Sequence, residues 1–153
     1  MPCGKKDMKR DNKSLVKIIV DTNVWVSFLM GRTLKGLECY IRDNHFQIVS
    51  CREQLTELQE VLYRPKMVRY FSMPQIDGIF KLLAEYALFE KIHSKIDICR
   101  DAKDNYLLAL AVDSNANFLI TGDRDLLSIK QIETTQIISF KDFENIFLID
   151  SNK

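Results

Sequence analysis

The sequence predicts an α/β fold, in which a central and mostly parallel β-sheet lies between layers of helices. Short apolar runs alternate along the chain with longer segments of helical periodicity, as in folds whose parallel strands are joined by helices. The 153 residues suffice for one domain with a proper core. An apolar fraction of 46% and a charged fraction of 28% are those of an ordinary soluble globular protein.

The first part of the chain predicts a strand, two helices and a second strand. The β-branched run at 18–20 is typical of a strand buried on both faces. Helical periodicity then covers 23–30, with Gly31 as the expected stop, and a second helix is expected over about 33–43. The run "FQIVS", at 46–50, predicts the next buried strand.

The second part continues the alternation. A helix over 52–64 has three leucines on one face and is expected to end at Pro65. Ser72 and Gln75 form a capping box for a long helix that follows. The remaining patterns predict a strand-like stretch around 91–98, a helix over 101–115, strands at 117–121 and 135–140, and a closing helix or strand at 142–148.

Charge and cysteine usage exclude several kinds of site. With a formal net charge of +1, any nucleic-acid binding would need a local basic patch. The four cysteines form no C-x-x-C pair and are not in zinc-ligand spacing with the two histidines, so no zinc site is expected. Free thiols without a signal peptide fit a reducing cytoplasm, and no apolar run approaches the ~20 residues of a membrane helix. Residues 1–14 are polar and aperiodic, which predicts a loose tail before a single domain over 15–150.

Two acidic residues follow predicted strands. Asp21 comes directly after the first strand, and Asp123 follows "FLIT" in "LITGDRDLL", where Gly122 is expected to allow a sharp exit. The carboxyl ends of parallel strands meet at one edge of the sheet, so the two acids are expected to be neighbours. Taken alone, they could equally be two separate helix caps or turn formers.

Helical segments supply two further acids. Asp104 precedes apolar residues of its helix by three, four and seven positions, which places its carboxylate on the core-facing stripe. Asp101 fits a helix cap. Glu57 lies at the edge of a leucine stripe, where an ordinary surface charge is the alternative.

Four carboxylates at one edge would raise each other's pKa unless a cation lies among them. Oxygen ligands without His or Cys select Mg²⁺ or Mn²⁺ over zinc. Such a site, with one ion or two ions ~3.5–4 Å apart, activates water for phosphodiester hydrolysis.

The chain resembles the PIN domain, a nuclease domain that includes VapC-like toxins. The resemblance covers about residues 16–140 and is carried by "IIVDTNVWVSFLMG", "IVSCREQLTELQEVLYRPKMVRYF" and "RDAKDNYLLALAVDSNANFLITGDRDLL". The pattern is similar to that of bacterial toxin components of toxin–antitoxin systems, although Ala102 stands where that group commonly has Pro.

The resemblance implies a three-layer α/β/α sandwich with Mg²⁺- or Mn²⁺-dependent endoribonuclease activity. It also implies an RNA substrate, a homodimer and a small antitoxin that covers the active-site groove. The implied metal ligands are Asp21, Glu57, Asp104 and Asp123, with Asn23, Asp101, Thr121 and Asp125 in support. The candidate phosphate contacts are basic residues in or near loops around these acids, namely Arg32, Lys35, Arg64, Lys66, Arg69 and Arg124.

Two alternatives stay open. A receiver or a haloacid-dehalogenase-like phosphotransferase also ends a strand on Asp, but Asn23 occupies the place of the second dehalogenase acid and the receiver pattern fits no better. A non-catalytic PIN-fold module that binds RNA or a partner would ordinarily lack one or more of the four acids. Binding of Mn²⁺ by the carboxylates discriminates between a catalytic site and such a module.

Overall fold

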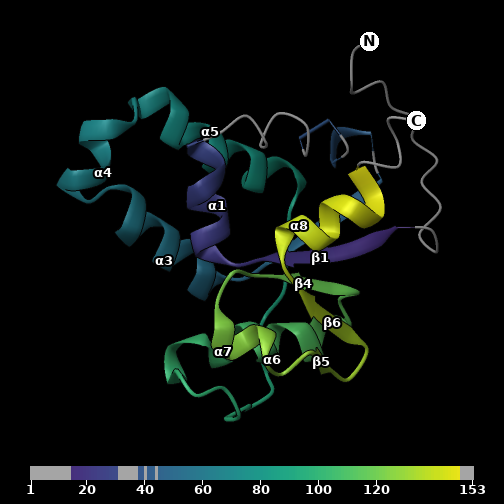
Figure 1. The fold of residues 1–153 in the computed structure, drawn as a ribbon. Coiled ribbons are helices and arrows are strands. Elements are labelled where there is room, and N and C mark those ends of the chain that lie inside the picture. The colour runs from purple at the N-terminus through teal and green to yellow at the C-terminus, as the bar shows by residue number, and fades with distance from the viewer. Residues whose placement is uncertain (1–14, 31–37, 40, 44, 149–153) are drawn as a thin grey trace.

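The computed structural model describes residues 15–30, 38–39, 41–43 and 45–148, within which six strands form one sheet (Figure 1). The order across the sheet is β3-β2-β1-β4-β6-β5. Every neighbouring pair is parallel except β5 and β6. The strands are β1 (Val16–Val20), β2 (Phe46–Ser50), β3 (Leu88–Phe89), β4 (Phe118–Ile120), β5 (Gln131–Ile132) and β6 (Thr135–Ile138).

Strand β1 lies inside the sheet because it is apolar on both faces. Ile18 and Val20 belong to one buried cluster and Ile19 belongs to the other, as the alternation of side chains along a strand requires. The last residue of β1, Val20, is paired with Ile120, the last residue of β4. The two strands therefore finish side by side at the same edge of the sheet.

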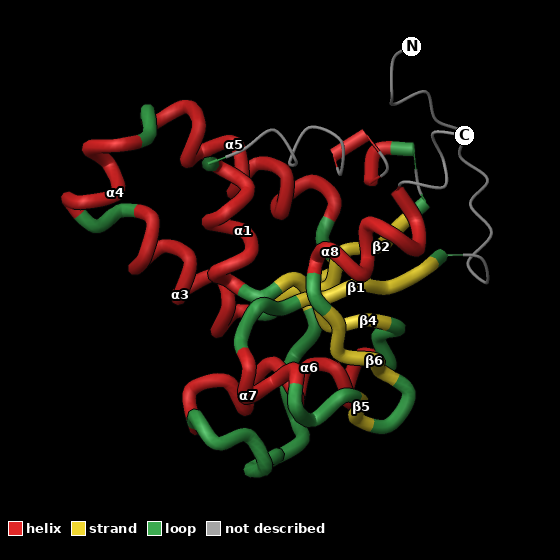
Figure 2. The backbone as a smooth tube through the Cα atoms, in the orientation of Figure 1, coloured by secondary structure: helices red, strands yellow, loops and turns green. Residues whose placement is uncertain are grey.

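Helices cover both faces of the sheet, which confirms the predicted α/β sandwich (Figures 1 and 2). Of the helices that the structure describes in full, four contribute fully buried side chains to one cluster, and two contribute them to the other. The first group consists of α1 (Thr22–Leu29), α3 (Arg52–Leu62), α5 (Met73–Tyr86) and α8 (Phe140–Phe143); the second consists of α6 (Asn105–Ser114) and α7 (Arg124–Leu127).

The capping box before α5 is present as predicted. The Ser72 hydroxyl accepts the N–H of Gln75 at 3.3 Å, and the Gln75 side chain accepts the N–H of Ser72 at 2.9 Å.

The helix predicted to end at Pro65 does end before this proline, which also begins a further helix that was not predicted. Helix α3 ends at Leu62, and Arg64 is extended, as is usual for a residue before proline. Pro65 then takes the first position of a further short helix, α4 (Pro65–Tyr70), where its missing N–H is not needed.

The strand expected around 91–98 is not formed. Strand β2 ends at Ser50, which is paired with Phe89. Only Leu88 and Phe89 therefore pair with β2, and these two residues form β3. The segment is held instead by Asp113 of α6, which accepts the N–H groups of His93 and Ser94. Ile92 and Ile96 still pack against the core, which explains the alternating pattern without a sheet.

The remaining differences are local. The helix expected over 101–115 divides into a 3₁₀ turn, η2 (Ala102–Asp104), and α6. Strand β5 was not predicted, and the closing segment is helical, with α8 followed by the π-helical turn η3 (Glu144–Leu148). The tail predicted at 1–14 and most of the helix predicted over 33–43 lie outside the described residues. Of the described helices, none has the length and apolarity to cross a membrane.

Candidate functional site

Asp21 lies at the carboxyl end of β1. Its N–H donates to the carbonyl of Ile120 at 2.9 Å, which keeps Asp21 in register with β4. Its own carbonyl accepts the first hydrogen bonds of α1, but its carboxylate does not cap that helix. The residue is only 6% exposed, and this burial raises the pKa of Asp21. The nearby N–H of Asn23 favours the charged form of Asp21, but no full capping hydrogen bond is formed, so helix capping alone does not account for the buried carboxylate.

Thr121 connects Asp21 to Asp123. This fully buried residue follows β4, and its hydroxyl donates to Asp21 Oδ2 at 2.7 Å. The hydroxyl oxygen of Thr121 also accepts the N–H of Asp123 at 3.0 Å. The bond from Thr121 favours the charged form of Asp21 and so opposes the effect of burial on its pKa. One hydroxyl thus fixes the carboxylate of one acid and the backbone of the other.

Asp123 both caps a helix and belongs to the acidic cluster. Its Oδ1 accepts the N–H of Asp125 at 2.8 Å and so caps α7. Its carboxyl group also faces that of Asp104, and its charge acts on Asp21. The expectation for Gly122 was wrong: its φ is not in the left-handed region, and a Cβ there would meet no atom within 4 Å.

Asp104, at the start of α6, brings a third carboxyl group close to Asp21 and Asp123. Its burial, the facing carboxyl of Asp123 and the charge of Asp21 together raise the pKa of Asp104 to about 7. Its Oδ2 atom is buried and has no hydrogen-bond partner among the described residues. An acid in this position must keep a proton or accept a cation.

Glu57 stands in a second hydrogen-bonded group on α3. Its Oε1 accepts the hydroxyls of Thr22 at 2.9 Å and Tyr106 at 2.5 Å. Burial and Glu57 both raise the pKa of Tyr106, so the phenol keeps its proton and remains a donor. The charge of Glu57 also raises the pKa of Asp21, so the hydrogen-bonded group around Glu57 is electrostatically linked to the group of Asp21, Thr121 and Asp123.

Gln54 explains why α3 presents Glu57 to this edge. It is fully buried; its Nε2 donates to the carbonyl of Val20 at 2.6 Å, and its Oε1 accepts the hydroxyl of Ser50 at 2.6 Å. Gln54 therefore ties the first turn of α3 to the last residues of β1 and β2. Glu57 lies one turn further along the same helix.

Among the described residues, no cationic side chain forms an ion pair with the acidic cluster formed by Asp21, Asp104, Asp123 and nearby Glu57. Between described residues, the only ion pair joins Arg42 to Glu38. Carboxylate oxygens without His or Cys suit Mg²⁺ or Mn²⁺, and the unpartnered Oδ2 of Asp104 is a free ligand atom. In the part of the chain described, no three His, Cys, Asp or Glu side chains already form a metal cage. Mg²⁺ does not need one, because it commonly binds through one or two carboxylates and completes its shell with water and phosphate.

The supporting residues occupy different environments. Asp101 accepts the N–H of Lys103 at 3.1 Å and caps η2, in keeping with the capping interpretation. Asn23 is exposed on the first turn of α1, and Asp125 is half-buried on α7.

The candidate phosphate contacts separate into two places. Arg124 is exposed next to Asp123, at the start of α7. Arg64, Lys66 and Arg69 are exposed on and beside α4, away from the sheet (Figure 1). Arg32 and Lys35 lie outside the described residues.

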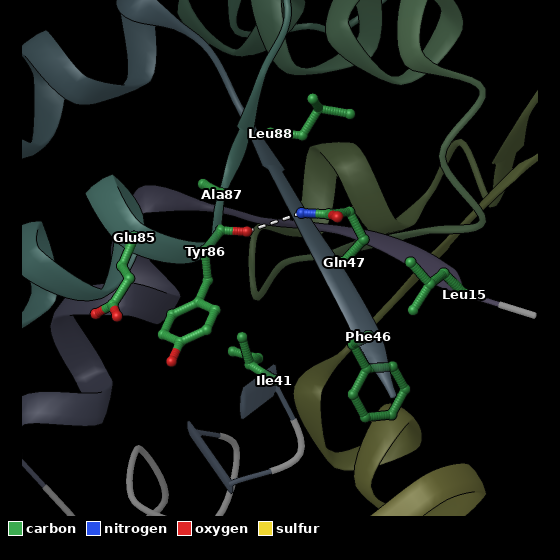
Figure 3. A pocket seen from close by; sticks show the side chains of 8 residues that line it. All are labelled: Leu15, Ile41, Phe46, Gln47, Glu85, Tyr86, Ala87 and Leu88. Atoms are coloured by element: carbon green, nitrogen blue, oxygen red, sulfur yellow. Dashed lines mark hydrogen bonds between the residues drawn. The ribbon is translucent and has the colours of Figure 1, made fainter. Parts of the chain in front are cut away.

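Two of the cavities lined by described residues lie away from the acidic cluster. One of about 240 Å³ is at the opposite end of β1 and β2, where the Gln47 side chain donates to the Tyr86 carbonyl at 2.8 Å (Figure 3). A wider one of about 610 Å³ lies beside the start of α3, and its charged residues are two basic and two acidic side chains, Arg52, Lys91, Glu53 and Glu90. Neither cavity contains an acid of the cluster, and the wider one has no excess charge that would attract phosphate.

Sequence analysis missed Thr22, Gln54 and Tyr106. Thr22 follows Asp21 directly, and this adjacency to a strand-end acid was a usable signal. Gln54 and Tyr106 carry no such signal, because their roles depend on how α3 and α6 pack against the sheet.

The family model for the PIN domain matches residues 17–125, which include all four acids. An uncharacterized protein of Methanocaldococcus jannaschii is 30% identical over 130 residues, which are 80% of this chain and 81% of that protein. The crystal structure of VapBC2 from Rickettsia felis, bound to a DNA fragment from their promoter, shares the fold with a TM-score of 0.53 at 15% identity. That similarity covers 80% of this chain and 97% of the matched chain. The chain belongs to the PIN domain family.

Proposed function

We propose that this protein is a metal-dependent endoribonuclease that hydrolyses RNA phosphodiester bonds. The observation that carries the proposal is the convergence of Asp21, Asp104 and Asp123 at one sheet edge, with an unpartnered buried oxygen on Asp104 and no ion pair to a cation of the described residues. Membership of a nuclease family supports it. One or two Mg²⁺ or Mn²⁺ ions bound there would supply Lewis-acid stabilisation and activation of water.

The residues of the site then have distinct roles in the proposed reaction. Asp21, fixed by Thr121, presents an oriented carboxylate, and Asp104 offers a second one that loses its proton when a cation binds. Tyr106 and Thr22 hold Oε1 of Glu57, which leaves its other oxygen free to orient water. Arg124, exposed beside Asp123, is available to contact the RNA phosphate.

We further propose that the protein is the toxin of a toxin–antitoxin pair that works in the cytoplasm as a homodimer. The resemblance of the fold to the chain in the VapBC2 structure supports a small antitoxin partner. Co-expression with the protein encoded next to its gene, followed by light scattering of the purified material, tests both the pairing and the dimer.

A second candidate function is a non-catalytic PIN module that binds RNA or a partner. The observation in its favour is that no three-ligand metal cage is formed among the described side chains. It predicts RNA binding without cleavage.

The test is cleavage of a mixed RNA pool with Mn²⁺ and with EDTA. A matched pair of variants on one helix serves as the control, Glu57→Gln at the site and Glu60→Gln on the exposed side of α3. The proposal expects Mn²⁺-dependent cleavage that Glu57→Gln reduces strongly and Glu60→Gln leaves unchanged. Cleavage that persists in EDTA, or equal loss in both variants, would overturn it.

A further inference from the structure

Helix α4 forms an exposed basic surface away from the acidic cluster. None of its residues is buried. Residues 61–76 include Arg64, Lys66 and Arg69 but no Asp or Glu, although the whole chain has a net charge of only +1. None of these three cations forms an ion pair with a described residue. In a nearly neutral chain, this is the local concentration of positive charge that phosphate binding requires.

The two sides of α4 differ in chemistry. Met67 and the following Phe71, four residues apart, pack against the core and anchor the helix. Lys66, Arg69 and Tyr70 are separated by three and four positions and lie together on the other side. Tyr70 is 73% exposed, and its ring contacts no aromatic ring of a described residue. An open aromatic ring beside two cations is a stacking platform of the kind that unpaired bases use.

A second ring adjoins this surface and is held rigidly. Tyr63, 41% exposed, stacks on Phe80 with the ring centroids 5.7 Å apart and an interplanar angle of 10°. Its hydroxyl donates to Asp77 at 2.8 Å. The outer face of Tyr63 therefore stays available without a loss of side-chain freedom on binding.

Helix α3 connects the acidic cluster to this surface (Figure 1). Leu62, the last residue of α3, follows Glu57 by five residues, which is roughly 7.5 Å at the rise of a helix, and Arg64 comes two residues later. A nucleic-acid strand that enters the cluster is therefore within reach of α4.

We propose that α4, through Arg64, Lys66, Arg69 and Tyr70, binds single-stranded RNA that flanks the bond to be cleaved. This inference rests on the proposed nuclease function and adds that the substrate is unpaired where it meets α4. Bases of duplex RNA are already stacked on each other and cannot stack on Tyr70.

The test is fluorescence anisotropy in EDTA, which prevents metal-dependent cleavage. The probes are a labelled 12-nucleotide single strand of mixed sequence and the duplex of that sequence. The variant Arg64→Ala/Lys66→Ala/Arg69→Ala is compared with Lys81→Ala/Lys95→Ala/Lys141→Ala, which removes three exposed cations elsewhere. Tyr70→Ala is compared with Tyr70→Phe, and circular dichroism verifies that each variant is folded.

We expect the α4 triple variant to weaken single-strand binding at least tenfold and to reduce the slope of log K against log salt by about 2, at ~0.7 per phosphate contact. The control triple variant should bind like wild type. Tyr70→Ala should weaken binding roughly fivefold or more, and Tyr70→Phe should restore it. Equal effects of the two triple variants, or equal affinity for duplex and single strand, would overturn the inference. So would unchanged RNA binding together with loss of a dimer in light scattering, which would assign α4 to a protein interface.

The outcomes separate this inference from the proposed function. If the wild type cleaves RNA but the α4 variants bind like the control, the nuclease proposal stands and the α4 inference fails. If α4-dependent binding is found without any cleavage, the RNA surface stands and the nuclease proposal fails.

Discussion

Replacing Thr121 by valine removes the link between Asp21 and Asp123 while nearly preserving shape. The hydroxyl of Thr121 donates to Asp21 Oδ2 at 2.7 Å and accepts the Asp123 N–H at 3.0 Å, in a fully buried position. In Thr121→Val both bonds are lost at once. The substitution therefore tests whether this one hydroxyl positions Asp21 and Asp123.

The expected loss of stability follows from these two bonds. A hydrogen bond to a charged group contributes about 1.5–3 kcal/mol, and a neutral one contributes about 1 kcal/mol. Burying a methyl group in place of the hydroxyl returns about 0.8 kcal/mol. The free energy of unfolding should fall by about 2–3 kcal/mol, which corresponds to roughly 5–10 °C in Tm for a domain of this size. The pKa of Asp21 should rise further, because the bond that favours its charged form is gone.

Thermal unfolding and Mn²⁺ titration of the same samples test the prediction. Affinity for Mn²⁺ should fall about 10–100-fold, as is usual when a partner of a ligating carboxylate is removed. Thr135→Val is the matched control, since Thr135 is equally buried but donates to the carbonyl of Ala116 at 2.7 Å. By the same sum, the loss of one neutral bond and the gain of a buried methyl group should cost less than about 1 kcal/mol of stability and leave Mn²⁺ affinity unchanged. If Thr121→Val and Thr135→Val behave alike in both measurements, Thr121 has no role in the site.

Three further predictions follow from the same geometry. Tyr106→Phe removes one of two donors to Glu57 and should lower the cleavage rate roughly tenfold while Mn²⁺ affinity changes little; an unchanged rate would contradict the role given to this bond. In the metal-free protein, the pKa of Asp104 is about 7, against 3.8 for the unfolded chain. Between these pH values the native state binds more protons than the unfolded state, so the free energy of unfolding should decrease as pH rises from about 4 to 7. Asp104→Asn should make that decrease clearly smaller in urea unfolding measured in EDTA, with the part due to the raised pKa of Asp21 remaining, and a variant with an unchanged decrease would contradict the prediction. Ser72→Ala breaks the capping box of α5 and should cost about 1 kcal/mol in thermal unfolding without affecting cleavage.

The parts of the fold that local pattern determines were predictable from the sequence. The apolar run at 46–50 coincides with β2, and the Ser72 and Gln75 pair caps α5 as expected. The convergence of Asp21 and Asp123 also followed from pattern alone, because carboxyl ends of parallel strands must meet at one edge. The inward position of Asp104 followed from its spacing to apolar residues on the helix.

The parts that depend on tertiary partners were not predictable. The alternation at 91–98 comes from packing on one side without a neighbouring strand, which periodicity cannot distinguish from a sheet. The end of a helix before Pro65 was predicted, but the further helix that begins at Pro65 was not, because it depends on the extended backbone at Arg64 and on the packing of Met67. The hydrogen bonds from Thr22 and Tyr106 to Glu57 join segments 35 and 49 residues apart, so no local signal reports them.

The central claim is that the acidic cluster holds a divalent cation, and calorimetric titration of Mn²⁺ into the wild-type chain at pH 7 tests it most directly. Titration in buffers of different ionisation enthalpy also reports the proton that Asp104 must release when the cation binds. The structure predicts binding with proton release in the wild type, and strong loss of binding in Asp21→Asn. No binding by a folded wild type, or equal binding by Asp21→Asn, would contradict the claim.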